Sequence, residues 1–162
     1  MEIRPVQAEE YATLGELTVA AYSTVHPIED MEEYAHELRD VAGRAAGADV
    51  LVAVDETGKV VGGVTYVPGP DSPSAEFTEP DGAGIRMLAV SPEAQGQGIG
   101  EALVRVCIDR AKDAGRTRIL LHSTYTMVAA HRLYLRLGFV RDTTIDWEPV
   151  PGLELFGFRL VL

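Results

Sequence analysis

The sequence predicts a mixed α/β fold, in which one central, mixed and mostly antiparallel sheet of about seven strands carries about four helices on both faces. Short β-branched runs and segments of helical spacing follow one another in the order β-α-α-β-β-β-α-β-α-β-β. The chain has 162 residues, and no repeat or Gly/Ser-rich linker divides it, so we expect one domain over residues 1–162. Hydrophobic residues make up 46% and charged residues 24% of the chain, which excludes a disordered or fibrous protein.

The N-terminal segment predicts a short strand and two helices. The strand covers Glu2–Arg4 and ends at Pro5, which lacks the N–H group that a strand ladder uses. Residues Ala8–Ala20 place apolar side chains at helical spacing and therefore predict an amphipathic helix. A second helix, acidic on its outer face, is expected over Glu29–Ala46, with Gly47 closing it.

A β-hairpin and a long loop come next. Val50–Val54 and Val60–Val67 are β-branched runs, and the polar segment Asp55–Gly58 between them is typical of a hairpin turn. Residues Pro68–Gly84 contain four prolines and predict a long irregular segment. Long loops inside compact domains are often functional.

The second half predicts two strand–helix pairs and two terminal strands. In order, they are Ile85–Val90, Gly100–Ala114, Arg118–His122, Met127–Leu137, Phe139–Ile145 and Leu153–Leu162. The first of these helices places Leu103, Cys107 and Ala111 on one apolar face. Gly115 and Gly138 follow the two helices in the position that a C-terminal cap prefers.

The charge of the chain excludes some partners and is unevenly distributed. The formal net charge is −11, from 14 basic and 25 acidic residues. Residues 1–81 carry 17 acidic and 4 basic side chains, whereas residues 82–162 carry 8 acidic and 10 basic ones. Because nucleic acid and anionic membranes need clustered cationic residues, we expect neither as a partner. The asymmetry reflects either solvated surface or two halves that handle ligands of opposite sign.

Cysteine content and the N-terminal segment limit the remaining classes. Cys107 is the single cysteine, which excludes an internal disulfide and a multi-cysteine metal site, and we expect no metal. The first residues have no apolar signal core, and no apolar run approaches the ~18 residues of a membrane helix. These features predict a soluble, cytoplasmic protein.

The most informative segment is the glycine-rich turn Gln95-Gly96-Gln97-Gly98-Ile99-Gly100, which follows a strand and opens into a helix. Unpaired N–H groups and the helix dipole suit such a turn to a phosphate or pyrophosphate. A Walker loop needs Lys-Ser/Thr after its last glycine, where Glu101-Ala102 stands. A dinucleotide fingerprint needs its third glycine at Glu101 and an acidic residue on the next strand, and both are absent. Both alternatives fail on spacing.

Two motifs together resemble the GNAT superfamily of N-acetyltransferases. The first is Leu88-Ala89-Val90-Ser91-Pro92 followed by Gln95-x-x-Gly98-x-Gly100, which is similar to the acyl-coenzyme A motif of that family. The second, Ala130-His131-Arg132-Leu133-Tyr134-Leu135-Arg136-Leu137-Gly138-Phe139, resembles its A-x-x-L-Y-x-x-L-G-F signature. The resemblance in motifs covers about residues 85–140, and the resemblance in topology covers nearly the whole chain.

The resemblance implies acetyl-CoA as the co-substrate and names the backbone that would hold it. Leu88, Ala89 and Val90 would pair with the pantetheine arm as another strand does, on a strand that splays from its neighbour. A backbone N–H near Leu88 would polarise the thioester carbonyl. The pyrophosphate would lie against the turn and the start of the helix, formed by Gln95, Gly96, Gln97, Gly98, Ile99, Gly100 and Glu101.

The resemblance also gives a general acid but leaves the base open. Tyr134 occupies the general-acid position of the family, and the alternative is an aromatic core residue. Candidate bases are Glu79, in the loop that precedes the coenzyme-binding strand, and His122, at the end of the neighbouring strand. Glu76 and Asp81 lie in the same loop, and each of these groups has an ordinary structural role as its alternative.

Other residues are implied as lining or as departures from the family. Tyr22 and His26 fall where family members build the acceptor pocket, so we expect them to line it. Met127 stands where many members carry an asparagine that hydrogen-bonds pantetheine, and a thioether cannot donate that bond. Thr124 and Thr126 are possible substitutes.

The sequence therefore predicts an acetyl-CoA-dependent N-acetyltransferase that acts by direct attack of a primary amine. The acceptor is a small molecule or a peptide, and the acidic N-terminal half favours a cationic one. The alternative is a non-catalytic acyl-CoA-binding regulatory module on the same fold. A homodimer is possible, since dimers are common in the family.

Overall fold

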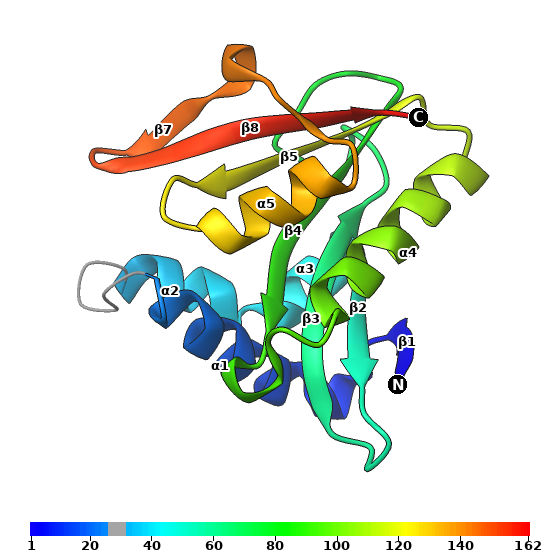
Figure 1. Ribbon diagram of the computed structural model, residues 1–162, viewed down its shortest axis with the longest axis vertical. Helices are drawn as coiled ribbons and strands as arrows, with labels where there is room; N and C mark the ends of the chain where they lie inside the picture. The colour runs from blue at the N-terminus through cyan, green and yellow to red at the C-terminus, as the bar shows by residue number, and fades with distance from the viewer. Residues whose placement is uncertain (26–31) are drawn as a thin grey trace.

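The computed structural model describes residues 1–25 and 32–162, and Figure 1 shows its elements in order. The strands are β1 Glu2–Pro5, β2 Asp49–Val54, β3 Val60–Val67, β4 Gly82–Val90, β5 Arg118–Thr124, β6 Val140–Arg141, β7 Trp147–Val150 and β8 Leu153–Val161. The α-helices are α1 Tyr11–Ser23, α2 Glu32–Arg39, α3 Val41–Gly47, α4 Ile99–Asp113 and α5 Val128–Arg136.

The strands form one mixed sheet in the order β1-β2-β3-β4-β5-β8-β6, with β7 pairing with β8 outside that path. Every pair is antiparallel except β4 and β5, which are parallel. The chain can make this parallel pairing because α4 carries it across the sheet between the two strands. The predicted mixed, mostly antiparallel sheet is confirmed.

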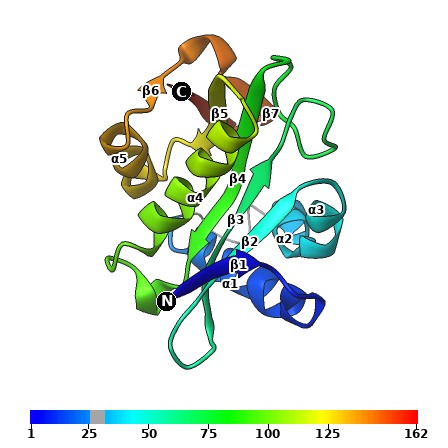
Figure 2. The same ribbon diagram turned by 90° about the vertical axis from the view of Figure 1, so that its right-hand side faces the viewer.

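Helices cover both faces of the sheet. Figure 2 shows α4 and α5 on one side and α1, α2 and α3 on the other. The predicted apolar face of α4 is confirmed, since Leu103, Cys107 and Ala111 are fully buried against the sheet. Two smaller apolar clusters lie on the opposite face, under α1 to α3. Within the described ranges, no helix combines the length and the apolar composition that a membrane crossing requires.

The helix predicted over Glu29–Ala46 is two helices within the described residues. Asp40 interrupts it, because its side chain accepts a hydrogen bond of 3.0 Å from the Gly43 N–H and so caps α3 instead of continuing α2. Arg44 then reaches back from α3 and donates to the carbonyls of Glu37 and Leu38, at 2.7 and 3.0 Å. These bonds satisfy two of the last carbonyls of α2 and tie the two short helices together.

The strand predicted over Phe139–Ile145 is also shorter than expected. Only Val140–Arg141 pairs with β8, a 3₁₀ turn follows, and the chain then adds β7, which the sequence pattern did not predict. Asp146 fixes this corner, because it accepts two bonds of 2.6 Å from the Arg141 guanidinium and one of 2.7 Å from the Gly157 N–H.

We expect this corner to stabilise the fold in a pH-dependent way. Hydrogen bonding by Arg141 lowers the pKa of Asp146 in the folded state, so the pair stabilises at pH above the unfolded pKa of about 4. That stability is lost as pH falls through the lower folded pKa. Asp146→Asn should cost about 1–2 kcal/mol in urea unfolding at pH 7, and much less near pH 2. An equal cost at both pH values would contradict this account, and Asp71→Asn, at an exposed loop position, is the control.

Candidate active site

The central feature of the site is an opening between β4 and β5. The two strands pair only from Gly82↔Arg118 to Ile85↔Leu121, so residues 86–90 of β4 have no pairing with β5 in the described structure. The register between β3 and β4 shifts at the same place, and Met87 there takes a φ of 56°. A β-bulge of this kind bends a strand away from its neighbour. The backbone of Leu88 to Val90 is therefore open to a ligand on that side.

The glycine-rich turn lies directly after this open strand. Gly96 and Gly98 have φ values of 81° and 83°, and a side chain at either position would meet nothing within 4 Å. Glycine is required there for its dihedral angles and not for space. Gly98 is the N-cap of α4, so the N–H groups of the first turn of α4 point outward beside the open strand.

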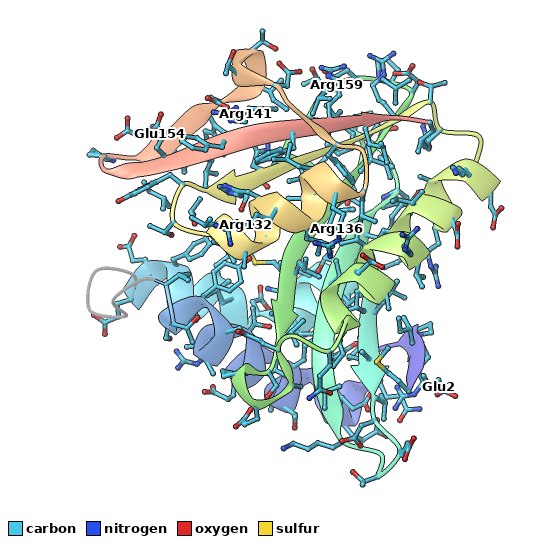
Figure 3. The ribbon with its side chains drawn as sticks, viewed as in Figure 1. Glu2, Arg132, Arg136, Arg141, Glu154 and Arg159 are labelled. Atoms are coloured by element: carbon cyan, nitrogen blue, oxygen red, sulfur yellow. The ribbon has the colours of Figure 1, made fainter. Side chains whose placement is uncertain are left out.

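A charged cluster covers the start of α4. Glu101 Oε1 lies 3.1 Å from Arg136 Nη2 of α5, and Glu101 Oε2 lies 3.4 Å from Arg105 Nε. Hydrogen bonding by Arg136, followed by that of Arg105, lowers the pKa of Glu101. Figure 3 labels Arg132 and Arg136 on α5, with Arg136 toward α4. A carboxylate therefore occupies the first turn of α4 and holds Arg136 near it.

This arrangement predicts that Glu101 weakens the binding of an anionic ligand at the turn. Glu101→Gln would remove a negative charge next to the free N–H groups and release Arg136. We expect the Kd for coenzyme A to fall about 3–10-fold at low salt and the gain to shrink at high salt. Isothermal titration measures both, with Asp113→Asn at the other end of α4 as the control. Weaker binding would show instead that the Glu101 carboxylate favours the ligand.

A cavity of ≈ 1020 Å³ lies between α2, the open part of β4, the end of β5 and the β7–β8 hairpin. In Figure 1, α2 and this hairpin lie on the same side of the molecule, at the left. Four groups of residues line the cavity: from α1, α2 and the loop, Tyr22, Glu32, Glu33, Tyr34, Glu37 and Glu76; from β4, Ile85, Arg86, Met87 and Leu88; from β5 to α5, His122, Ser123, Thr124, Tyr125, Met127 and Tyr134; and from the hairpin, Trp147, Pro149, Pro151, Gly152, Leu153 and Leu155.

Tyr134 is the buried aromatic residue of this cavity. Its ring is 4% exposed and packs against Phe139 and Phe158, at centroid distances of 5.6 and 5.8 Å. Burial raises the pKa of the phenol well above its ordinary value, and Tyr22 across the cavity adds to the rise. The phenol is therefore protonated throughout the neutral range and can act as a hydrogen-bond or proton donor.

Alternation along β5 separates His122 from Ser123. The Ser123 hydroxyl lies 3.1 Å from Nε2 of His131, which ties the end of β5 to α5, the helix of Tyr134. His122 points to the other face, where its Nε2 lies 2.8 Å from the Ile145 carbonyl oxygen. Because a carbonyl only accepts, Nε2 of His122 carries the hydrogen, and Nδ1 is left as the nitrogen that can accept a proton.

Arg86 joins two acidic segments at the floor of the cavity. Its Nη2 lies 3.1 Å from Glu37 Oε1 of α2, and its Nε lies 2.9 Å from Glu76 Oε1 of the proline-rich loop. Tyr22 and Tyr34 lie beside this group, hydrogen-bonded to each other with ring centroids 6.0 Å apart. The pKa of Tyr22 is raised to about 12, mainly because the phenol is buried.

The predicted coenzyme-binding residues Ala89, Val90 and 95–101, and Thr126, are not among the residues that line the cavity. The other predicted site residues separate into three groups. Tyr22, Glu76, Leu88, His122, Thr124, Met127 and Tyr134 line the cavity. Two loop carboxylates do not: Glu79 Oε1 lies 3.7 Å from Arg159, and Asp81 bonds to Thr117 and Arg118, at the opposite end of the sheet strands. His26 lies outside the described residues.

Most of the other cavity residues were not predicted as site residues, and three of them matter for the chemistry: Arg86, Tyr34 and Trp147. Arg86 sits in a strand pattern that gives no sign of its partners, which come from segments 49 and 10 positions away. Tyr34 lies within the acidic helix, where its pattern is that of ordinary surface. Trp147 is the single tryptophan of the chain, and this was the one feature of the sequence that could have pointed to it as a site residue.

Comparison with known proteins agrees with this geometry. The sequence model of the acetyltransferase (GNAT) family matches residues 11–139. The chain belongs to this family of acyltransferases, as the two motifs indicated. Within the described residues, no group of three or more His, Cys, Asp or Glu is arranged to hold a metal ion.

Two relatives and one solved structure illustrate the similarity. The chain is 36% identical over 109 residues to N-acetyltransferase 8B of Rattus norvegicus, covering 67% of this chain and 46% of that protein. It is 32% identical over 122 residues to mycothiol acetyltransferase of Arthrobacter sp. (strain FB24), covering 70% and 36%. The chain thus spans less than half of these relatives. PaiA N-acetyltransferase from Thermoplasma acidophilum, solved with coenzyme A, has a TM-score of 0.77 at 17% identity, covering 99% and 98%.

Proposed function

We propose that this protein transfers an acetyl group from acetyl-CoA to a primary amine by direct attack of the amine on the thioester. One observation carries the proposal: Leu88, on the open part of β4, and the buried phenol of Tyr134 line the same cavity, and the glycine-rich turn follows that strand directly in the chain. A strand with free backbone groups, an anion-binding helix start and a proton donor are the three parts that this reaction needs.

The residues present fit the coenzyme. The backbone of Leu88, Ala89 and Val90 on the side away from β3 would pair with the pantetheine arm, in exchange for the bond that the Val90 carbonyl accepts from Gln95 Nε2, and the N–H groups of residues 95–101 would hold the pyrophosphate. The coenzyme supplies an activated acetyl thioester. A backbone N–H at the bulge near Leu88 would stabilise the negative charge that develops on the carbonyl oxygen.

Two side chains of the cavity have the properties of an acid and a base. Tyr134, protonated and buried, would give its proton to the departing thiolate. On the opposite face of β5, Nδ1 of His122 would accept the proton of the amine, directly or through water. We prefer His122 to the two loop carboxylates, because Glu79 is not among the residues that line the cavity and Glu76 is paired with Arg86.

The charge of the cavity supports a cationic acceptor. Four carboxylates and one guanidinium are among the lining side chains, from Glu32, Glu33, Glu37, Glu76 and Arg86. An excess of negative charge raises the local concentration of cations. The acidic N-terminal half supplies these carboxylates, and the half with ten basic residues supplies the glycine-rich turn.

The proposal is tested by two measurements on the same protein. Thermal unfolding with saturating coenzyme A should show stabilisation, and thiol release from acetyl-CoA should depend on a primary amine. Cationic amines should exceed acidic ones, by a margin that shrinks as salt is added. Stabilisation without turnover on any amine would favour the non-catalytic module. The absence of stabilisation would exclude the cofactor assignment.

A further inference from the structure

The cavity has two chemically different walls. The wall formed by α2 and the proline-rich loop is acidic, and Glu33 and Glu37 on α2 are four residues apart, on one face of the helix. The wall formed by the β7–β8 hairpin is apolar, with Trp147, Pro149, Pro151 and Leu153. A ligand that contacts both walls needs a cationic end and an apolar end.

The apolar wall is a continuous surface on the face of the sheet opposite α5. Trp147 pairs with Leu155, and Leu155 pairs with Thr124, so these three side chains lie in a row across β7, β8 and β5. His122, two positions before Thr124, lies on the same face, and its ring meets that of Trp147 at 6.4 Å and 76°. Trp147 nevertheless remains 45% exposed, and Tyr125, which also lines the cavity, is 51% exposed. About half of the surface of each of these two aromatic side chains is therefore not covered by other residues and is available to contact a ligand.

The acidic wall places charge near the reacting end of the cavity. Arg86, which holds Glu37 and Glu76, is two residues before Leu88 on β4. One guanidinium between two carboxylates leaves a net charge of −1, which one ammonium group would neutralise. An amine drawn to this wall lies beside the open part of β4, whereas the remainder of the molecule extends toward the hairpin.

We propose that the acceptor is a primary amine attached through a short chain to an aromatic or similarly bulky apolar group, which packs on Trp147. This inference rests on the proposed function for the identity of the reaction, and the walls of the cavity add the substrate class. The ammonium group first gives one proton, through His122, to the solvent, and the neutral amine then attacks. Its nitrogen forms the amide as the C–S bond breaks, and the second proton that it loses balances the proton that the thiolate takes up.

The test compares 2-phenylethylamine with ethylamine, which carries the same charge without the ring. We expect kcat/KM for 2-phenylethylamine to be about tenfold higher or more, since a ring buried on Trp147 leaves water. Trp147→Ala should lower that value about tenfold more than it lowers the value for ethylamine, so that the ratio of the two values falls about tenfold, and the KM for acetyl-CoA should stay unchanged. Val161→Ala, at an exposed position on β8 outside the cavity, is the matched control.

Equilibrium binding distinguishes this inference from the proposed reaction. Trp147 is the single tryptophan, so intrinsic tryptophan fluorescence reports on the hairpin wall alone. We expect 2-phenylethylamine, but not ethylamine, to change that fluorescence in a saturable way in the presence of coenzyme A. A saturable change without acetylation of any amine would support a binding site for aromatic amines at the hairpin and overturn the proposed reaction. Equal kcat/KM for the two amines, with no fluorescence change, would overturn the substrate class and leave the reaction standing.

Discussion

Tyr134→Phe is expected to lower kcat by about 10²-fold or more, while the Kd for coenzyme A changes by less than about twofold. The phenol is the buried donor of the cavity, and its raised pKa keeps the proton on it at neutral pH. Without it the thiolate leaves unprotonated, which raises the barrier of the chemical step and leaves the backbone contacts of the coenzyme intact. Steady-state kinetics with a saturating amine and titration with coenzyme A separate the two effects.

Tyr66→Phe is the matched control. Tyr66 is equally buried, at 3% exposed, and it does not line the cavity. Its hydroxyl has no hydrogen-bond partner among the residues that the structure describes. Its replacement should leave kcat unchanged. If Tyr134→Phe also leaves kcat unchanged under conditions where chemistry limits the rate, Tyr134 is an aromatic core residue and not the acid.

Gly98→Val is expected to weaken coenzyme A binding by about 10²-fold or more. Gly98 has a φ of 83°, and a β-branched residue is a genuine outlier at such a value. Valine would force the turn into another backbone conformation, and the N–H groups at the start of α4 would no longer converge on a pyrophosphate. Titration calorimetry measures the affinity, and far-ultraviolet circular dichroism shows whether the sheet and helices are retained.

Gly115→Val separates the loss of affinity from the backbone strain. Gly115 follows the other end of α4 and has a φ of 72°, and a side chain at this position would meet no atom within 4 Å. The two variants should lose similar stability, about 1–2 kcal/mol each. Only Gly98→Val should lose coenzyme affinity. An equal loss of affinity in both would mean that the turn itself does not hold the ligand.

Local patterns were sufficient to predict most of the fold. The β-branched runs of β2 and β3 and the apolar stripe of α4 are properties of neighbouring residues, and they occur where they were expected. The break at Asp40 was missed, because it depends on a side-chain cap that competes with helix continuation. The strand β7 was missed because its four residues are too few to show the alternation of apolar and polar residues that predicts a strand, and it forms by pairing with β8.

The site was predictable to the extent that it resides in contiguous motifs. Gly96 and Gly98 of the predicted turn take positive φ values, and Tyr134 lines the cavity. Contacts between distant segments were not predictable. Glu79 and Glu76 lie three residues apart in one loop, yet one meets Arg159 of β8 and the other meets Arg86 of β4. The direction in which a loop carboxylate points is set by tertiary packing, which no local pattern specifies.

Thiol release in the first turnover, measured by rapid quench with and without an amine, tests the central claim most directly. Direct attack predicts no thiol released from acetyl-CoA in the absence of an amine and one equivalent per active site once 2-phenylethylamine or another cationic amine is added. The acetylated amine should appear at the same rate. A full equivalent of thiol without any amine, together with an acetyl group on the protein by intact mass, would contradict direct attack. Bound coenzyme with no thiol release for any amine would contradict the proposal that this protein catalyses acetyl transfer.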